Sequence, residues 1–249
     1  MAGLMLLLAG CAKAPYTGRN QVMLVSQAQE LQLGRQSADE ILQKEPKGKD
    51  PQQVALVEHV GERVAAVADR PDFGWEFHLI EAPDTANAFC LPGGKVFVYT
   101  GLFKYATTEG ELAAVVAHEV GHAIARHGAE RMSISLITQL GHSAASIALS
   151  GTAPVAVQAF EVAYGIGANV GVILPFSREQ EYEADHLGLI LMAKAGFDPK
   201  AALSFWERMS QADTKKPPEF LSTHPSDANR IASIRSLMPE AQYYYTSRR

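Results

Sequence analysis

The side chains best suited to chemistry stand together in His118-Glu119-Val120-Gly121-His122, which has the spacing H-E-x-x-H. Residues four apart on a helix lie roughly 40° from one another around its axis, so both imidazoles face one point and can bind one Zn²⁺. Glu119 follows the first histidine, where a carboxylate can take the proton of a metal-bound water. The pattern predicts hydrolysis of peptide bonds, with His118 and His122 as zinc ligands and Glu119 as the general base.

The motif needs a helix, and the flanking residues favour one. Thr107 or Thr108 can cap its start, and Glu111, three residues after Thr108, would complete a capping box. Gly128 fits a position just after the helix ends. Apolar residues recur with helical spacing on the side that would face a core, at Leu112, Val115, Val116, Val120 and Ile124.

A catalytic zinc site needs a third protein ligand. Metzincins use a glycine three residues after the second histidine of the motif and a third histidine six residues after it, but here Ala125 and Gly128 stand at these positions. His127 comes one residue too early. It lies about 180° from His118 around a continuous helix, so we expect it to face away from the metal. The metzincin arrangement is therefore excluded.

Thermolysin-type sites take the third ligand from a glutamate on a later helix. The segment 177–185 offers Glu179, Glu181 and Glu183. Glu181 and Asp185 share one helix face, so one can bind the metal while the other orients a ligand histidine through its second nitrogen. Glu179 and Glu183 share another face, and helical geometry does not choose between the pairs. Such an acidic cluster also suits the start of a solvated helix.

The composition indicates a globular protein. The chain has 249 residues, 47% of them hydrophobic and 20% charged, with a formal net charge of −5. The mild acidity and the lack of a basic stripe argue against nucleic acid as a partner. Two cysteines, Cys11 and Cys90, are too few for a disulfide framework or a cysteine-type zinc site. Cys90 lies in an apolar segment, where we expect a buried and unreactive thiol.

Residues 1–11 form an apolar run that is too short to span a bilayer and ends in Leu-Ala-Gly-Cys. The run is typical of a secretory signal, and its end resembles a bacterial lipobox, which predicts lipidation at Cys11. The usual Lys or Arg at the start of such a signal is missing. Ala12 in place of Asp favours the outer membrane, so we expect a periplasm-facing lipoprotein of the bacterial cell envelope, anchored to the membrane by lipid. Residues 12–25 would be a tether.

Hydrophobic periodicity predicts a mostly helical chain with a few strands. Strands are expected at 75–80 and 95–100, with Pro92-Gly93-Gly94 as the turn between them. Polar residues and a break at 151–154 interrupt the Ala- and Gly-rich stretch 133–174, so we interpret it as two packed helices and not as membrane spans. Other helices are expected at 26–44, 52–69, 177–195, 199–211 and 227–237, before a loose tail at 241–249.

Four segments of the chain match a known pattern in their order. They are Asn87-Ala-Phe-Cys-Leu-Pro-Gly-Gly with Val96-Phe-Val-Tyr-Thr-Gly-Leu102, then HEVGH, then Ser-Arg-x-x-Glu-x-x-Ala-Asp at 177–185, and Ser222-Thr-His-Pro225 with Arg230-Ile231. Together they resemble the zinc metalloproteases that include the CAAX prenyl protease, the heat-shock protease HtpX and the mitochondrial Oma-type protease. The membrane spans of the first two are not evident, so the chain looks like the lipoprotein or periplasmic branch.

The resemblance implies an α+β, mostly helical, zincin-like domain at 26–240, with a small β-sheet beside the H-E-x-x-H helix. It also implies one Zn²⁺ per chain as the cofactor. The family's third ligand corresponds to Glu181, which leaves Asp185 to orient a ligand histidine.

The same resemblance assigns roles to residues outside the motif. Asn87 and Ala88 would lie on the strand to which an extended substrate adds as a further strand. His224 would be an auxiliary metal ligand or stabilise the oxyanion. Arg178 would pair with the acidic cluster or with substrate carbonyls.

Two other functions stay open. Glu119-x-x-His122 and Glu183-x-x-His186 match the paired motifs of ferritin-like di-iron proteins, with further ligands available from Glu30, Glu58 or Glu62. The predicted strands and the unused His118 argue against such an oxygen-chemistry protein. A latent protease or chaperone-like module would keep the same fold without turnover. We favour a zinc endopeptidase in quality control of the cell envelope, with unfolded or misassembled envelope proteins as substrates.

Overall fold

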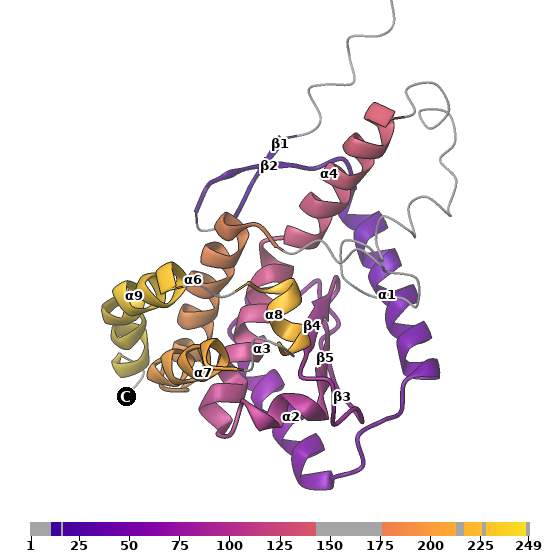
Figure 1. Cartoon of the computed structure of the whole chain (residues 1–249). Coiled ribbons are helices and arrows are strands. Elements are labelled where there is room, and N and C mark those ends of the chain that lie inside the picture. Colours follow the sequence, from indigo (N-terminus) through magenta and orange to yellow (C-terminus); the bar gives the residue numbers. More distant parts are fainter. Residues whose placement is uncertain (1–10, 16, 143–175, 213–216, 226–227, 248–249) are drawn as a thin grey trace, which may run out of the picture.

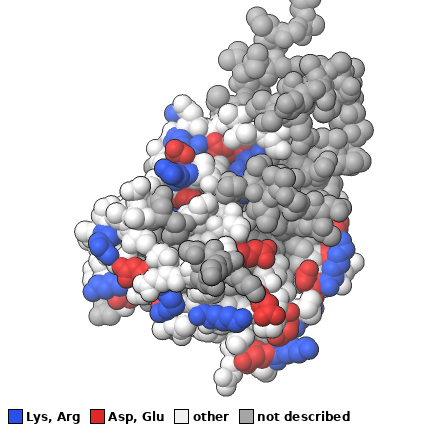
Figure 2. All heavy atoms as spheres, in the orientation of Figure 1, with Lys and Arg blue, Asp and Glu red and all other residues white. Residues whose placement is uncertain are grey.

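A computed structural model describes residues 11–15, 17–142, 176–212, 217–225 and 228–247 of the chain. In this part of the chain, helices surround a small mixed β-sheet (Figure 1). The expected α+β, mostly helical class is confirmed. Acidic and basic side chains are interspersed over the face of the molecule seen in Figure 2.

The three-stranded sheet has the order β3-β5-β4, with bounds Glu76–Ile80 for β3, Ala88–Leu91 for β4 and Lys95–Tyr99 for β5. β3 runs parallel to β5, and β4 runs antiparallel to it. The two expected strands are therefore present, but the turn at Pro92-Gly93-Gly94 does not join them. It joins β5 to β4, a strand that the periodicity did not predict. Gly93 and Gly94 have φ values of +85° and +84°, a region that favours glycine.

Alternate residues of β5 enter two apolar cores, because successive side chains of a strand point to opposite faces. Val96 and Val98 belong to a core that includes residues of α2 (Pro51–Ala65) and α3 (Glu109–Ile124). Phe97 belongs to a second core that includes Ala38 of α1 (Gln27–Lys44). The sheet is thus a buried layer between helices, and its edge strand β4 borders α3.

α3 carries the H-E-x-x-H motif and begins with the expected capping box. The Thr108 hydroxyl accepts a hydrogen bond from the Glu111 backbone, and the Glu111 carboxylate accepts one from the Thr108 backbone. The expected helix end at Gly128 is wrong. α3 ends at Ile124, because Arg126 has a φ of +57° and turns the chain into α4 (His127–His142).

α6 (Arg178–Lys194) packs along α3 and brings the acidic segment to the motif. The two backbones come unusually close at two glycines. A Cβ on Gly121 would lie 3.0 Å from the carbonyl oxygen of Ala184, and a Cβ on Gly188 would lie 3.0 Å from the backbone nitrogen of His118. Because both positions lack a side chain, the acidic helix lies directly against the motif helix.

In the part of the chain that the structure describes, the remaining helical elements are η1 (Thr100–Lys104), α7 (Lys200–Ser210), α8 (Glu219–Thr223) and α9 (Ala228–Thr246). The short η1 and α8 were not predicted. The expected loose tail at 241–249 is wrong for the residues that the structure describes, because α9 continues to Thr246. Ala241 is buried, and the ammonium of Lys194 lies 4.9 Å from the centre of the Tyr244 ring. These contacts hold the end of α9 against α6.

An antiparallel pair of short strands, β1 (Cys11–Lys13) and β2 (Asn20–Val22), replaces the predicted tether at 12–25. The pair passes over the adjacent ends of α4 and α6 (Figure 1). Gln21 is buried, and its side-chain amide donates a hydrogen bond of 2.8 Å to the carbonyl of Ala125. The segment therefore packs on the domain.

Two predictions extend beyond the described residues. α4 makes the first part of 133–174 helical, whereas 143–174 lie outside that range, as do residues 1–10 of the predicted signal. For Cys11 the structure describes the backbone in β1. Among the helices of the described residues, none has the length and apolar content that a bilayer span requires.

The contact at Gly188 gives a test of the packing. Gly188→Val should lower the free energy of unfolding of the metal-free protein by about 2 kcal/mol, because overpacking outweighs the small gain in helix propensity. Gly188→Ala gains up to about 1 kcal/mol in propensity and should lie between the wild type and the valine variant. Urea titration followed by circular dichroism measures both, and a valine variant as stable as the wild type would contradict the close contact.

Candidate metal centre

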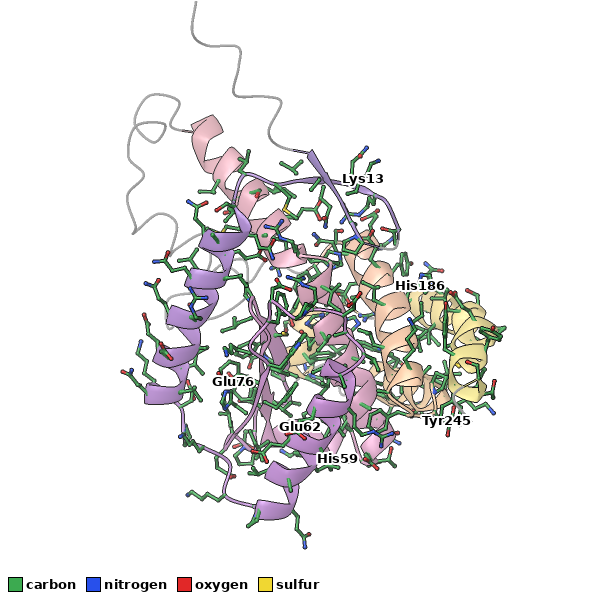
Figure 3. The ribbon with its side chains drawn as sticks, turned by 180° about the vertical axis from the view of Figure 1, so that it is seen from behind. Lys13, His59, Glu62, Glu76, His186 and Tyr245 are labelled. Atoms are coloured by element: carbon green, nitrogen blue, oxygen red, sulfur yellow. The ribbon has the colours of Figure 1, made fainter. Side chains whose placement is uncertain are left out.

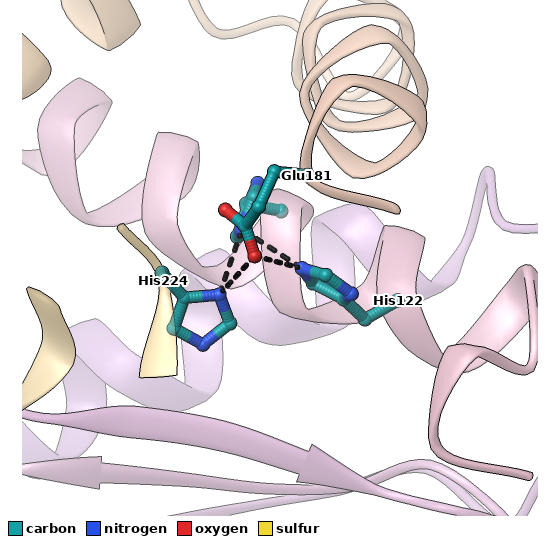
Figure 4. A group of neighbouring side chains, drawn as sticks. His122, Glu181 and His224 are labelled. Atoms are coloured by element: carbon teal, nitrogen blue, oxygen red, sulfur yellow. Dashed lines mark hydrogen bonds and ion pairs between the residues drawn. The ribbon is translucent and has the colours of Figure 1, made fainter. Parts of the chain in front are cut away.

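Four buried side chains from three parts of the chain converge on one point. His118 and His122 come from α3, Glu181 from the first turn of α6, and His224 from the residue after α8 (Figure 4). Each is at most 4% exposed, and one donor atom from each lies within 4.8 Å of the others. The structure thus brings together the three ligands expected from the sequence and the expected auxiliary histidine.

The separations of the donor atoms fit a metal. His118 Nε2 lies 3.0 Å from His122 Nε2 and 3.2 Å from His224 Nδ1. A Glu181 oxygen lies 3.3 Å from His122 Nε2 and 3.0 Å from His224 Nδ1. Four tetrahedral ligands at 2.0–2.1 Å from Zn²⁺ would be about 3.3 Å apart. The donor set, imidazole nitrogens with a carboxylate, is also one that zinc prefers.

Asp185 lies behind the first histidine of the motif. Its Oδ1 lies 3.0 Å from His118 Nδ1, the ring nitrogen that points away from the cluster. Arg230, on α9, binds the same carboxylate through two bonds of 2.6 and 2.8 Å. With the carboxylate at Nδ1, the Nε2 of the same ring faces the other donors.

Arg230 is a functional residue that the reasoning on ligands missed. It is 2% exposed, contacts Glu181 as well as Asp185, and lies with its guanidinium carbon 3.7 Å from the centre of the Trp206 ring. A buried charge is costly unless it is paired, so this arginine compensates two carboxylates at once. The sequence did contain an indication of this residue, because Arg230 belongs to one of the four segments on which the resemblance rests.

His127 does not face away from the centre, so that expectation is wrong. Its Nδ1 lies 2.9 Å from His122 Nδ1, and its Nε2 lies 2.9 Å from an oxygen of Glu183. The angle of about 180° assumed that α3 continues. Because α3 ends at Ile124, the turn at Arg126 swings His127 back toward the motif. His127 reaches the outer nitrogen of His122 and is not a metal ligand.

The donors differ in their tendency to hold protons. Burial acts to lower the pKa of His118, but hydrogen bonds to Asp185 and Glu181 outweigh it and raise this pKa to about 9. Burial lowers the pKa of His122 well below its usual range. Burial acts to raise the pKa of Glu181, but the charges of Arg230 and His224 hold it well below the usual value. A cation that binds here would therefore displace a proton from His118.

Glu119 lies next to the donors with an unsatisfied oxygen. It is 2% exposed, and its Oε1 lies 3.3 Å from His224 Nε2 but has no hydrogen-bond partner among the described residues. Burial raises the pKa of this carboxyl. A cavity of about 20 Å³ lies beside Glu119, His122 and His224. That volume is enough for about one water molecule, the reactant that a general base would activate.

Asn87 and Ala88 line the same cavity, as the substrate-strand prediction requires. The side-chain oxygen of Asn87 accepts a hydrogen bond of 2.9 Å from the backbone N–H of Ala88. The backbone carbonyl of Asn87 accepts one of 3.0 Å from the backbone N–H of Tyr99 on β5. Ala88 opens the edge strand β4, and Cys90, a free and buried thiol whose pKa burial raises, follows on the same strand. The edge of the sheet therefore reaches the donor cluster.

Arg178 does not lie in the donor cluster. It is exposed at the start of α6 and lines a separate pocket of about 280 Å³. Glu181, Tyr182 and Arg230 line the same pocket, so Arg178 shares a pocket with one of the four donors.

The structure argues against the di-iron alternative. His186 lies on the outer side of α6, where its Nε2 is 2.9 Å from Glu240 of α9 (Figure 3). Glu183 is engaged by His127 and by Arg19 instead of facing Glu119. The two Glu-x-x-His motifs therefore do not converge on a shared pair of metals.

Comparison with known proteins identifies the family. The model of peptidase family M48 matches residues 51–238, about three quarters of the chain. The chain belongs to peptidase family M48. The resemblance to zinc metalloproteases that the four segments indicated is therefore confirmed. The match also includes all four donors and Glu119.

Relatives within this family include enzymes from several organisms. The mitochondrial metalloendopeptidase OMA1 of Schizosaccharomyces pombe is 45% identical over 192 residues, which cover 75% of this chain and 53% of the relative. OMA1 of Saccharomyces cerevisiae is 30% identical, covering 97% and 75%. The β-barrel assembly-enhancing protease of Escherichia coli is 32% identical, covering 89% and 46%. The chain thus spans about half the length of the first and third of these M48 relatives.

The predicted location is wrong. Relatives from fission yeast, budding yeast, Arabidopsis thaliana and Bos taurus are named as mitochondrial metalloendopeptidases. This finding overturns the expectation of a bacterial outer-membrane lipoprotein anchored through Cys11. That expectation depended on a four-residue likeness at the end of 1–11, whose usual basic start is missing.

The contacts of Glu183 predict an acid-dependent contribution to stability. Burial acts to raise its pKa, but hydrogen bonds from His127, Arg19 and Thr17 lower it from 4.5 to about 2. Its stabilising effect is therefore complete above pH 4.5 and is lost as the pH falls toward 2. Glu183→Gln should destabilise the metal-free protein by about 2 kcal/mol at pH 7. The difference from wild type should shrink between pH 5 and pH 3 in urea titrations, and a constant difference would contradict the lowered pKa.

Proposed function

We propose that this M48 chain is a zinc-dependent endopeptidase. His118, His122 and Glu181 would hold one Zn²⁺, and Glu119 would act as the general base. The observation that carries the proposal is the convergence of these buried donors next to a carboxylate with an unsatisfied oxygen. Zinc that is bound in such a site supplies a Lewis acid and a water whose pKa is lowered to about 7.

The residues of the chain divide the proton transfers and the orientation between them. Glu119 takes the proton of the attacking water at its free oxygen and delivers it to the leaving amine. Burial suits this role, because it raises the pKa of the Glu119 carboxyl and so makes the carboxylate a stronger base. Asp185 holds the His118 ring through Nδ1, and Arg230 holds Asp185. The lining of apolar and aromatic side chains keeps bulk water away from the reacting atoms.

His224 completes a closed set of four protein donors. Catalytic zinc sites keep one position for water or substrate, whereas structural sites use four protein ligands. A water or a substrate carbonyl can bind the metal only if one of these four donors leaves it. We infer that His224, which follows the short α8, withdraws from the cluster for turnover. This arrangement unites the endopeptidase with the latent module that the sequence also allowed, as a closed and an open form of one site.

The substrate of the proposed reaction is an extended polypeptide. β4 is one of the two edge strands of the three-stranded sheet, and Asn87 and Ala88 bring its start to the donor cluster. A peptide that adds to this edge must be extended, which folded proteins rarely offer. We propose that unfolded or misassembled proteins are cleaved, in a quality-control role. The name of the Escherichia coli relative, which refers to β-barrel assembly, supports that role.

Glu119→Gln tests the general base. The variant keeps the shape of the site but cannot accept a proton, so cleavage of unfolded casein should fall by about 10²–10⁴-fold while zinc is retained. Glu109→Gln, an exposed glutamate at the start of the same helix, is the matched control and should cleave normally. Retained proteolysis by Glu119→Gln would refute the mechanism.

Alanine variants of three glutamates test the ligand choice. Glu181→Ala should raise the dissociation constant for zinc most, because it removes a ligand and leaves Arg230 partly uncompensated. Glu183→Ala should have an intermediate effect, and the exposed Glu179→Ala should have none. Competition with a chromophoric chelator measures the three constants. Equal losses would reopen the choice between Glu181 and its neighbours.

A further inference from the structure

The two ligand histidines of α3 are each supported at the ring nitrogen that points away from the donors. His118 contacts Asp185 directly, and Arg230 holds Asp185. Among the described residues, no carboxylate contacts the outer ring nitrogen of His122, Nδ1. Its Nδ1 instead lies 2.9 Å from the Nδ1 of His127. The second ligand therefore depends on another histidine.

A carboxylate and an arginine complete this second chain of contacts. His127 Nε2 lies 2.9 Å from Glu183 Oε2, and Arg19 donates to that oxygen through Nε and Nη2 at 3.0 and 2.9 Å. The hydroxyl of Thr17 donates to the other oxygen of Glu183. Both ligand histidines are thus connected to a carboxylate of α6 that an arginine neutralises. For His118 the arginine is Arg230 on α9, and for His122 it is Arg19, which precedes β2.

The donor and acceptor atoms of His122, His127 and Glu183 determine which nitrogens carry protons in this series of contacts. A carboxylate accepts, so His127 donates to Glu183 from Nε2. Two ring nitrogens 2.9 Å apart hold one proton between them, and His127 with its proton on Nε2 offers a bare Nδ1. His122 therefore donates from Nδ1. Its Nε2 is left with a lone pair, and this is the nitrogen that faces the other donors.

Arg19 also connects two helices. Its Nη1 and Nη2 lie 2.8 and 2.7 Å from the two oxygens of Glu130 on α4, while Glu183 lies on α6. The side chains of both glutamates are at most 7% exposed. Two buried carboxylates repel one another unless a cation lies between them. The guanidinium supplies that cation, and it keeps Glu183 in place under His127.

The rest of the strand pair fastens to the same region. The side-chain amide of Gln21 on β2 donates a hydrogen bond of 2.8 Å to the carbonyl of Ala125, the residue that follows α3, and lies 3.3 Å from Glu130. The segment 11–22 therefore touches the end of α3, α4 and α6 together. It lies over the end of the motif helix at which His122 sits (Figure 1).

We propose that the β1–β2 segment is a working part of the metal centre and not a tether. Arg19 positions Glu183, Glu183 positions His127, and His127 holds the ring of His122 in the orientation and tautomer that zinc requires. The proposal deepens the proposed function and depends on it for the identity of the metal. Arg19, Glu183 and His127 are positioning residues, because none of them touches the metal or the substrate.

The tautomer of His122 gives the first test. In the metal-free protein labelled with ¹⁵N-histidine, two-dimensional ¹H–¹⁵N spectra should show the proton of His122 on Nδ1. In His127→Ala the fixed tautomer should be lost, since its acceptor is gone. A proton on Nε2 in the wild type, or an unchanged tautomer in His127→Ala, would overturn the proposal. A merely structural role of His127 would not move this signal.

Zinc affinity gives the second test. Arg19→Gln and His127→Ala should each raise the dissociation constant for zinc by about 10–100-fold in chelator competition, the usual effect of removing a residue that orients a ligand. Arg70→Gln is the matched control, because Arg70 makes a similar two-bond pair with Asp72 away from the donors. It should bind zinc as the wild type does. Folded variants of Arg19 and His127 with wild-type affinity would overturn the proposal.

The two tests separate the proposal from the function on which it rests. A wild-type protein that binds no zinc would refute the proposed function, while the tautomer of His122 in that protein would still decide the inference. If Arg19→Gln does not fold, His127→Ala and the wild-type spectrum give the answer. If zinc is bound and the tautomer is as expected but affinity does not change, the positioning role is refuted.

Discussion

Gly121 and Gly188 let α3 and α6 lie against one another with little more than backbone between them. This contact fixes the distance from the two histidines of α3 to the carboxylates of α6. A wider spacing would still permit a helical domain, but Glu181 would then be too far from His118 to bind the same metal ion.

The close approach creates a problem of buried charge. Glu119, Glu181, Glu183 and Asp185 are all nearly excluded from water, and four carboxylates at such density repel one another. The fold meets this cost with two arginines that arrive from opposite ends of the sequence, one before β2 and one on α9. Glu119 is the exception, since neither arginine forms an ion pair with it in the described contacts. Burial raises the pKa of Glu119 and outweighs the opposing charge of Arg230, which suits a base that is to accept a proton.

The local features of the fold could be predicted from the sequence because their causes are local. The capping box at Thr108 and Glu111, the helix of the motif and the spacing of its two histidines depend on residues within one or two turns. The third ligand could not be predicted in this way. Helical geometry did not distinguish Glu181 from Glu179 or Glu183 as the ligand, and only the family resemblance favoured Glu181. The end of α3 was mispredicted because the residue with the positive φ there is Arg126, whereas such a φ is usually expected at a glycine. Nothing in the sequence indicated the contact of Arg19, because its partner Glu183 lies 164 positions further along the chain.

Cys90 follows Ala88 along β4, and it lines the small cavity next to Glu119. Its thiol is buried, and a raised pKa keeps it in the unreactive protonated form. Alkylating reagents consequently have no access to it while the centre stays shut. Cys90 is therefore a natural probe of the opening of the site. Once Cys11, the other cysteine of the chain, is replaced by serine, the rate at which maleimide consumes Cys90 reports how often the cavity is exposed to solvent.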